Sequence, residues 1–249
     1  MYSTENKKIH YFYNGIFYTR SINEFVNDIL FQKIYGGEGL LKKILKISKN
    51  SNISFSSSMI NENSIKPWIK SGWTINHKLN VCVLNLRNSN HRYSSDNKHI
   101  EIKKLEHKDI EYLLELDHKI FEDYWKNSKS SLEETMKSCN NNYLFKSGGE
   151  NNLDGYAILG ETRKFTYLQR IGIVKSSQGS GLGNNLLNCV ISFAVEKKFI
   201  NMKLNTQSDN IAALNLYKKN KFEISPRKLV IMKTSWIVLH SLWLTYGGR

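Results

Sequence analysis

The part of the chain that most constrains its fold is residues 167–222, where a glycine-rich loop separates a predicted strand from a predicted helix. Residues 167–174 (Tyr-Leu-Gln-Arg-Ile-Gly-Ile-Val) are rich in β-branched and aromatic side chains and are short enough for a strand. Apolar side chains then recur at 186, 187, 190, 191, 194 and 195, the three-and-four spacing of a helix. Where the strand leads into the helix, the sequence reads Gln178-Gly179-Ser180-Gly181-Leu182-Gly183.

This loop has the chemistry of a pyrophosphate site. The first turn of a helix carries N–H groups without intrahelical acceptors, and the helix dipole adds partial positive charge there. Glycines let a bulky anion approach the backbone and permit dihedral angles that a Cβ would forbid. The stretch from Gln178 to Asn184 is therefore predicted to hold a pyrophosphate, the alternative being an ordinary loop at a helix start.

Two common phosphate-binding motifs do not fit this loop. The Walker motif ends in Gly-Lys-Ser/Thr, whereas Gly183 is followed by Asn184-Asn185, so a nucleotide triphosphatase is not indicated. The dinucleotide fingerprint requires G-x-G-x-x-G and an acidic residue about twenty residues later, but the glycines stand at 179, 181 and 183 and position 203 is lysine. The pattern that remains is Gln-x-x-Gly-x-Gly.

That pattern resembles the acetyl-CoA signature of the GNAT superfamily of N-acetyltransferases. Three more features follow in that family's order and spacing: the strand at 168–174, Asn210 after a second strand, and Tyr217, which leads into Phe222. The resemblance implies an α/β (α+β) fold in which helices flank a mixed central sheet. It also implies an N-acetyltransferase that uses acetyl-CoA as donor, needs no metal and acetylates a primary amine, either a small molecule or a protein N-terminus.

The resemblance also assigns roles to individual residues. Backbone N–H groups at Ile171 and Ile173 would hold the pantetheine arm and polarise the thioester carbonyl. Asn210 would bind the cofactor arm, and Tyr217 would be the general acid toward sulfur, since its hydroxyl is protonated at neutral pH. Without the resemblance, Tyr217 fits a core aromatic better, and Asn210 fits a helix N-cap or both roles. The residues assigned to cofactor binding are Ile171, Ile173, Gln178, Gly179, Ser180, Gly181, Leu182, Gly183, Asn184 and Asn210.

The general base is not evident from the sequence. The second half resembles the ribosomal-protein, alanine-acetylating type of GNAT enzyme, in which a glutamate lies five residues before the equivalent of Asn210; here that position is Asn205. An amide cannot take a proton. Either a water chain ordered by Asn205 and Gln207 removes it, or a carboxylate from another segment does, with Glu122 and Asp123 as candidates that also fit exposed loop acids. The acceptor amine is not identified.

The first half of the chain repeats landmarks of the second. Without a gap, Asn61, Trp68 and Trp73 align with Asn210, Tyr217 and Phe222, and a deletion of about five residues aligns Gly37-Glu38-Gly39 with Gly181-Leu182-Gly183. We therefore expect a degenerate GNAT-like unit at 1–90, a linker at 91–98, a catalytic GNAT domain at 99–234 and a C-terminal tail at 235–249. Because Trp68 has no hydroxyl, the first unit is expected to pack and shape rather than catalyse.

Local patterns predict several further elements. Asn14-Gly15 between two aromatic runs predicts a hairpin, and apolar spacing predicts a helix over 22–32. Asp109 is the expected N-cap of a helix at 110–120, whose Asp117 and His118 are expected to face solvent. Residues 131–134 (Ser-Leu-Glu-Glu) form a capping-box pattern that would open another helix. The apolar tail fits an extra strand, a docking segment or a poorly ordered end.

Charge and cysteine content exclude some other classes. The formal charge of +14 fits attraction to polyanions, CoA phosphates included, but a compositional bias in which many lysines alternate with asparagines is the favoured explanation. No basic block interleaved with aromatics marks a nucleic-acid face. The three cysteines form no CxxC pair, so neither a zinc site nor a disulfide framework is predicted, and buried thiols in a reducing cytosol are expected. The N-terminus lacks a signal peptide's apolar core and no run approaches a membrane span, so a cytoplasmic protein without membrane contact is expected.

Two functions from different classes remain open. The intact Gln-x-x-Gly-x-Gly pattern and Tyr217 favour an acetyltransferase. The missing glutamate and the degenerate first unit favour a regulatory module that holds acyl-CoA without turnover.

Overall fold

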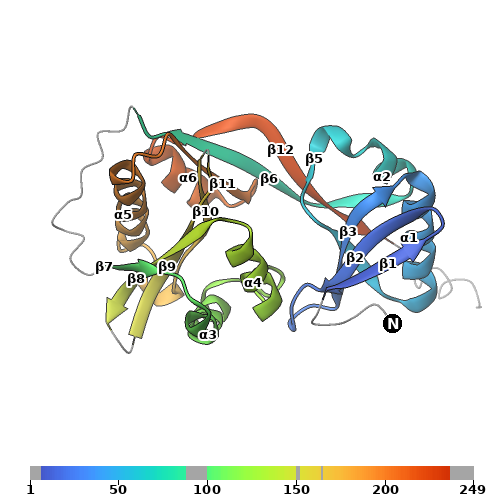
Figure 1. The fold of residues 1–249 in the computed structure, drawn as a ribbon, viewed down its shortest axis with the longest axis horizontal. Helices are drawn as coiled ribbons and strands as arrows, with labels where there is room; N and C mark the ends of the chain where they lie inside the picture. Colours follow the sequence, from blue (N-terminus) through green and yellow to red (C-terminus); the bar gives the residue numbers. More distant parts are fainter. Residues whose placement is uncertain (1–6, 88–99, 150–151, 164, 236–249) are drawn as a thin grey trace, which may run out of the picture.

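A single mixed sheet runs through the molecule from end to end (Figure 1). The computed structural model describes residues 7–87, 100–149, 152–163 and 165–235. Within these residues, twelve strands lie in the order β1-β2-β3-β4-β12-β6-β11-β10-β9-β8-β7, with β5 paired to β12 beside that path. Helices flank this sheet, so the predicted α/β (α+β) fold class is confirmed.

The first unit consists of a hairpin, a third strand, a helix, a short strand, a second helix and a long strand. The predicted hairpin is present, with Tyr13 and Asn14 in its loop and Phe12 paired with Gly15. The elements are β1 (Lys8–Phe12), β2 (Gly15–Ser21), β3 (Asp28–Gly36), α1 (Glu38–Ser51), β4 (Ser54–Ser57), β5 (Ile60–Asn61), α2 (Lys66–Lys70) and β6 (Trp73–Asn85).

The second unit repeats this order after an additional strand and two additional helices. Its elements are β7 (Ile100–Lys104), α3 (Ile110–Ile120), α4 (Lys129–Lys137), β8 (Asn141–Gly149), β9 (Asn152–Glu161), β10 (Thr166–Ile173), α5 (Leu182–Glu196), β11 (Asn201–Gln207), α6 (Ile211–Lys219) and β12 (Glu223–Thr234). In each unit a helix connects two parallel strands: α1 connects β3 with β4, and α5 connects β10 with β11. The expected linker at 91–98 lies outside the described residues, as does the tail beyond Ser235.

The two units exchange their last strands. β6 ends the first unit in sequence but pairs antiparallel with β11 of the second, from Leu79–Gln207 to Asn85–Asn201. β12 ends the second unit but pairs with β4 and β5 of the first. β6 and β12 also pair with each other over much of their length, and in Figure 1 they run together between the two lobes. Each unit is therefore completed by a strand of the other.

Alternating side chains along the strands build the cores on the two faces of the sheet. In β8, Phe145 packs in a cluster with α5, whereas its neighbour Leu144 packs on the opposite face with α3 and α4. In the first unit, the core beneath α1 and α2 includes Val230 and Met232, which come from β12. No helix among the described residues is long and apolar enough to cross a membrane.

Three local expectations are corrected by the structure. The helix predicted over 22–32 is wrong: this segment is a loop followed by β3, which pairs with β2 and β4. The helix predicted from the 131–134 capping box begins earlier, at Lys129, with Ser128 accepting a hydrogen bond from Ser131 N. Asp109 precedes α3 as expected, but its buried carboxylate accepts from Glu106 N (2.9 Å) and so closes the turn before the helix.

Because β12 crosses into the first unit, replacing Met232 by Ala should destabilise the first unit's core. Met232 is fully buried there, so the free energy of unfolding should fall by about 2–5 kcal/mol. Ile224→Ala, on the same strand but 55% exposed, should change it by less than about 0.5 kcal/mol. Urea unfolding followed by circular dichroism measures both values, and equal effects of the two variants would contradict the exchanged packing.

Candidate active site

The two parallel strands at the centre of the second unit separate soon after they begin to pair. β10 pairs with β11 only at Thr166–Met202 and Tyr167–Lys203. Gln169 then forms a bulge in β10, where the register against β9 shifts between Leu168 and Arg170. A bulge bends its strand and leaves backbone groups unpaired. Beyond Tyr167, the edge of β10 that faces β11 therefore borders an opening in the sheet.

Two adjoining cavities fill this opening. The smaller cavity, about 290 Å³, is lined by Tyr217, Tyr167 and Asn205 among others. The larger cavity, about 670 Å³, reaches Gln178 at the glycine loop. Both are lined by Ile171 of β10 and by Phe121, Trp125, Gln207 and Asn210. Together they connect the glycine loop with Tyr217.

The glycine loop has the conformation that its composition predicts. Gly179 and Gly181 have φ values of 81° and 88°, and a Cβ at either position would meet no atom within 4 Å. The backbone conformation therefore calls for glycine, and the space above it is open. α5 begins at Leu182 without a side-chain N-cap, and among the described residues the N–H groups of Gly179, Gly181 and Gly183 donate to no protein acceptor. These donors are available to an anion.

Polar side chains of the loop stabilise its conformation through hydrogen bonds within the protein. Gln178 Nε2 donates to the carbonyl of Ile173 (3.0 Å), and Ser180 Oγ donates to the carbonyl of Ser177 (2.7 Å). Asn184 Oδ1 accepts from Asn220 Nδ2 (3.0 Å), which ties α5 to the end of α6. These side chains, predicted to bind the cofactor, thus hold the loop in place through contacts within the protein.

Asn210 and Tyr217 each have a structural contact and a position beside the cavities. Asn210 Oδ1 accepts from Ala213 N (3.0 Å), so Asn210 is the N-cap of α6, and it lines both cavities. Tyr217 is 6% exposed and packs against Phe222, with ring centroids 5.6 Å apart, while also lining the smaller cavity. Burial raises the pKa of Tyr217, so its hydroxyl stays protonated at neutral pH.

The smaller cavity has no carboxylate among its described lining residues. Asn205 stands where the ribosomal-protein type of enzyme has a glutamate. Its side-chain amide forms a hydrogen bond with Tyr167, and burial raises the pKa of Tyr167 to about 12. Of the two carboxylates proposed from the sequence, Glu122 lines the larger cavity. Asp123 is exposed and pairs with Lys126 Nζ (2.7 Å). The cavity beside Asn205 therefore has no carboxylate from another described segment that could replace the missing glutamate.

A buried ion pair that the sequence reading missed supports one wall of the cavities. Asp117 is 1% exposed, so the expectation that it faces solvent is wrong. Its carboxylate accepts from Arg170 Nε (2.9 Å), Asn127 N (2.7 Å) and the hydroxyl of Tyr156, which burial keeps protonated by raising its pKa. Asp117 lies four residues after the buried Leu113, a helical spacing that places it on the apolar face.

The segment after α3 is held from two sides. Arg170 donates to the carbonyl of Trp125 (2.6 Å), with its guanidinium 3.5 Å from the centroid of the Phe121 ring. From the first unit, the buried Asn23 donates from Nδ2 to the carbonyls of Asp123 and Lys126, both at 2.8 Å. Residues 121–127 are thereby fixed beside the opening.

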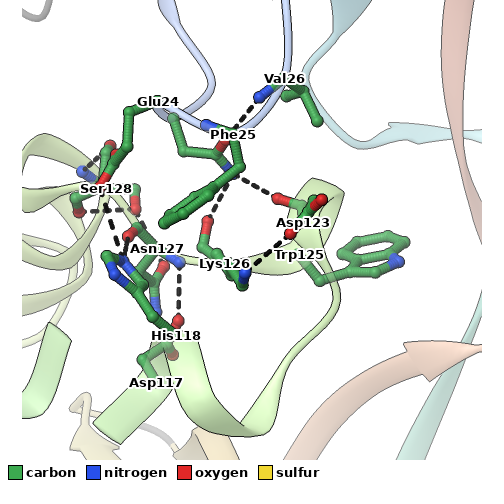
Figure 2. A network of polar contacts seen from close by, with 12 residues as sticks. Glu24, Phe25, Val26, Asp117, His118, Asp123, Trp125, Lys126, Asn127 and Ser128 are labelled. Atoms are coloured by element: carbon green, nitrogen blue, oxygen red, sulfur yellow. Dashed lines mark hydrogen bonds and ion pairs between the residues drawn. The ribbon is translucent and has the colours of Figure 1, made fainter. Parts of the chain in front are cut away.

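Residues 24–26 face this segment from the first unit, as Figure 2 shows. Asn23 Oδ1 accepts from the N–H groups of Phe25 (2.9 Å) and Val26 (3.2 Å), which folds the loop into position. His118, also expected to face solvent, is partly buried: its Nε2 lies 2.8 Å from the carbonyl oxygen of Asn127, and its ring meets Phe25 edge-on.

Comparison with known proteins finds a family match within the second unit. Residues 110–222 match the model of the acetyltransferase (GNAT) family. A search of curated proteins returned no match.

Solved structures that resemble the chain extend over both units. A tandem GNAT protein from the clavulanic acid biosynthesis pathway aligns with a TM-score of 0.62 and 10% identity, covering 88% of this chain and 78% of that one. A GCN5-related N-acetyltransferase from Kribbella flavida aligns at 0.58 and 11%, covering 92% and 89%, and one from Sphaerobacter thermophilus at 0.58 and 13%, covering 87% and 76%. At these identities the similarity establishes the fold.

If the glycine loop binds the pyrophosphate of acetyl-CoA, Gly181→Asp should weaken that binding by about tenfold or more, because it adds bulk and a negative charge beside the phosphates. Gly37→Asp is the matched control, since Gly37 precedes α1 as Gly181 precedes α5 and a Cβ there also meets no atom within 4 Å. Titration calorimetry with acetyl-CoA should show the loss only for Gly181→Asp. Equal affinities of this variant and the wild type would contradict the assignment.

Proposed function

We propose that this protein is an acetyl-CoA-dependent N-acetyltransferase that acetylates a primary amine, of a small molecule or a protein N-terminus, by direct attack. The observation that carries the proposal is the opening between β10 and β11, which joins the glycine loop to the buried Tyr217 through two adjoining cavities. The match of residues 110–222 to the GNAT family model supports acetyl transfer as the reaction class.

The proposed co-substrate would lie along this opening. The backbone of residues 178–184 would hold the pyrophosphate, aided by the start of α5. The pantetheine arm would follow the exposed edge of β10 at Ile171 and Ile173, replacing the strand partner that this edge lacks. Asn210, whose side chain already caps α6, would contact the arm where it borders both cavities. The thioester would then lie in the smaller cavity beside Tyr217.

In the proposed reaction, the amine nitrogen attacks the thioester carbonyl, a C–N bond forms and the C–S bond breaks. Backbone N–H groups at the bulge of β10 would stabilise the oxyanion of the tetrahedral species. The departing thiolate would take the proton of the Tyr217 hydroxyl, which solvent later replaces. The raised pKa of Tyr217 keeps that proton in place until negative charge develops on sulfur.

The tandem arrangement and the resemblance to alanine-acetylating enzymes belong to this proposal. The repeated element order and the similarity to a tandem GNAT protein support two units, at 1–90 and 99–234. Asn205, in place of the glutamate of the ribosomal-protein type, indicates that the acceptor proton leaves by another route.

The presence of Asn205 in place of a glutamate also favours a second function, that of a binding module without catalytic activity. Without a carboxylate base in the smaller cavity, the protein would bind acyl-CoA and not turn it over, acting as a regulatory module. The two functions share the cofactor site and differ in one observable, the release of free CoA thiol when an amine is added.

Calorimetry of acetyl-CoA against the purified protein, with a thiol-release assay over a panel of amines on the same sample, separates them. The acetyltransferase predicts binding together with amine-dependent thiol release. Binding without release from any amine would instead support the module, and no binding would refute both.

Tyr217→Phe tests the proposed acid. The variant keeps the ring that packs against Phe222 and loses only the hydroxyl, so it should fold and bind acetyl-CoA as the wild type does. The turnover rate should fall by about 100-fold, the lower part of the range for a general acid. The measurement is kcat from thiol release together with Kd from calorimetry. An unchanged kcat would exclude Tyr217 as the acid.

A further inference from the structure

The strand that the first unit contributes to the second brings a histidine to the candidate active site. Leu79 of β6 pairs with Gln207 of β11, and Ser208 N donates to the carbonyl of Lys78 (2.9 Å), so the middle of β6 lies beside the end of β11. Side chains alternate along a strand, and His77 therefore points to the same face as Leu79. Leu79 lines the smaller cavity and His77 lines the larger one.

His77 occupies a defined position in the wall that faces β10. Its ring lies 4.5 Å from that of Tyr124 and 4.8 Å from that of Trp125, centroid to centroid, so the segment after α3 packs against it. Ile171 and Gly172 of β10 line the same cavity. An acceptor entering this cavity would have the proposed thioester site on one side and the imidazole on the other.

From this placement we infer that His77 is the general base of the proposed acetyl transfer and takes the proton that the acceptor amine loses on attack. The inference rests on the proposed function. The amine nitrogen forms its bond to the carbonyl carbon, one proton passes to the imidazole, and sulfur leaves with the proton of Tyr217. The imidazolium then returns its proton to solvent. The proposed base is thus supplied to the second unit by the first.

Burial, opposed in part by nearby carboxylates, favours the neutral form of His77 that a base requires. Burial lowers the pKa of His77 below its ordinary value of 6.5, and Lys233 of β12 lowers it further. Asp209, before α6, and Asp28, on β3, act in the opposite direction, and Asp28 is itself paired with Lys233 (2.8 Å). Glu122 lines the same cavity from the segment after α3. With a folded-state pKa below 6.5, the imidazole is neutral at pH 7 and becomes a cation only in more acidic solution.

His77→Gln, assayed with an amine that supports thiol release by the wild type, tests the inference. The variant should bind acetyl-CoA normally, while kcat/KM at about pH 7.5 should fall by about 100-fold. The wild-type profile of kcat/KM should show a loss of activity below pH 6.5 as His77 protonates, and the variant should lack this step. His10→Gln is the matched control, because His10 also has a burial-lowered pKa but lies in β1, stacked on Phe17.

A second variant separates chemistry from packing against Tyr124 and Trp125. His77→Ala should lose activity to a similar extent, and added imidazole should restore at least about tenfold of it, which a packing role alone would not allow. Retention of rate and pH profile by His77→Gln would overturn the inference while leaving the acetyltransferase proposal intact. Absence of thiol release by the wild type with every amine would overturn both.

Discussion

The antiparallel pairing of β6 with β12 is the interaction on which the rest of the structure depends. Each strand completes the sheet of the unit to which it does not belong in sequence, so neither sheet is whole without the other. The pairing satisfies backbone groups that would otherwise lie at an open edge. It also fixes the distance and angle between the units, because a continuous hydrogen-bonded sheet tolerates little sliding.

The two units share an element order but differ in how their parallel strands pair and pack. In the first, β3 and β4 pair over four residue pairs, and three aromatic rings pack together beneath them: Trp68 and Trp73 at 4.9 Å, and Phe31 and Trp73 at 5.5 Å. In the second, pairing of β10 with β11 stops after two residue pairs, and Tyr217 stands beside a cavity. The parallel strands of the first unit thus stay paired over a longer stretch than those of the second. This difference favours the second unit as the location of the proposed cofactor site.

What the sequence predicted well was set by local chemistry. The conformation of the glycine loop could be predicted because Gly179 and Gly181 have positive φ angles, which glycine adopts without steric cost. The prediction of a helix over 22–32 was wrong because the same apolar spacing is compatible with a loop followed by a strand. Pairing with β2 and β4 and the hydrogen bonds of Asn23 stabilise the loop and strand instead. The burial of Asp117 could have been predicted from its helical spacing to Leu113. The position of His77 at the cavity could not, because nothing near it in sequence indicates that β6 pairs with a strand of the other unit.

The wall of the cavities opposite β10 is therefore a product of both units. Arg170, held by the buried Asp117, positions residues 121–127 from within the second unit, and Asn23 and His77 contact the same segment from the first. A buried carboxylate with a guanidinium partner is costly to disturb, which makes this wall rigid. The glycine loop and the edge of β10, by contrast, involve the second unit alone. The proposed contacts to the pyrophosphate and the pantetheine arm thus come from one unit, whereas the surface that an acceptor would meet depends on how the exchanged strands hold the two together.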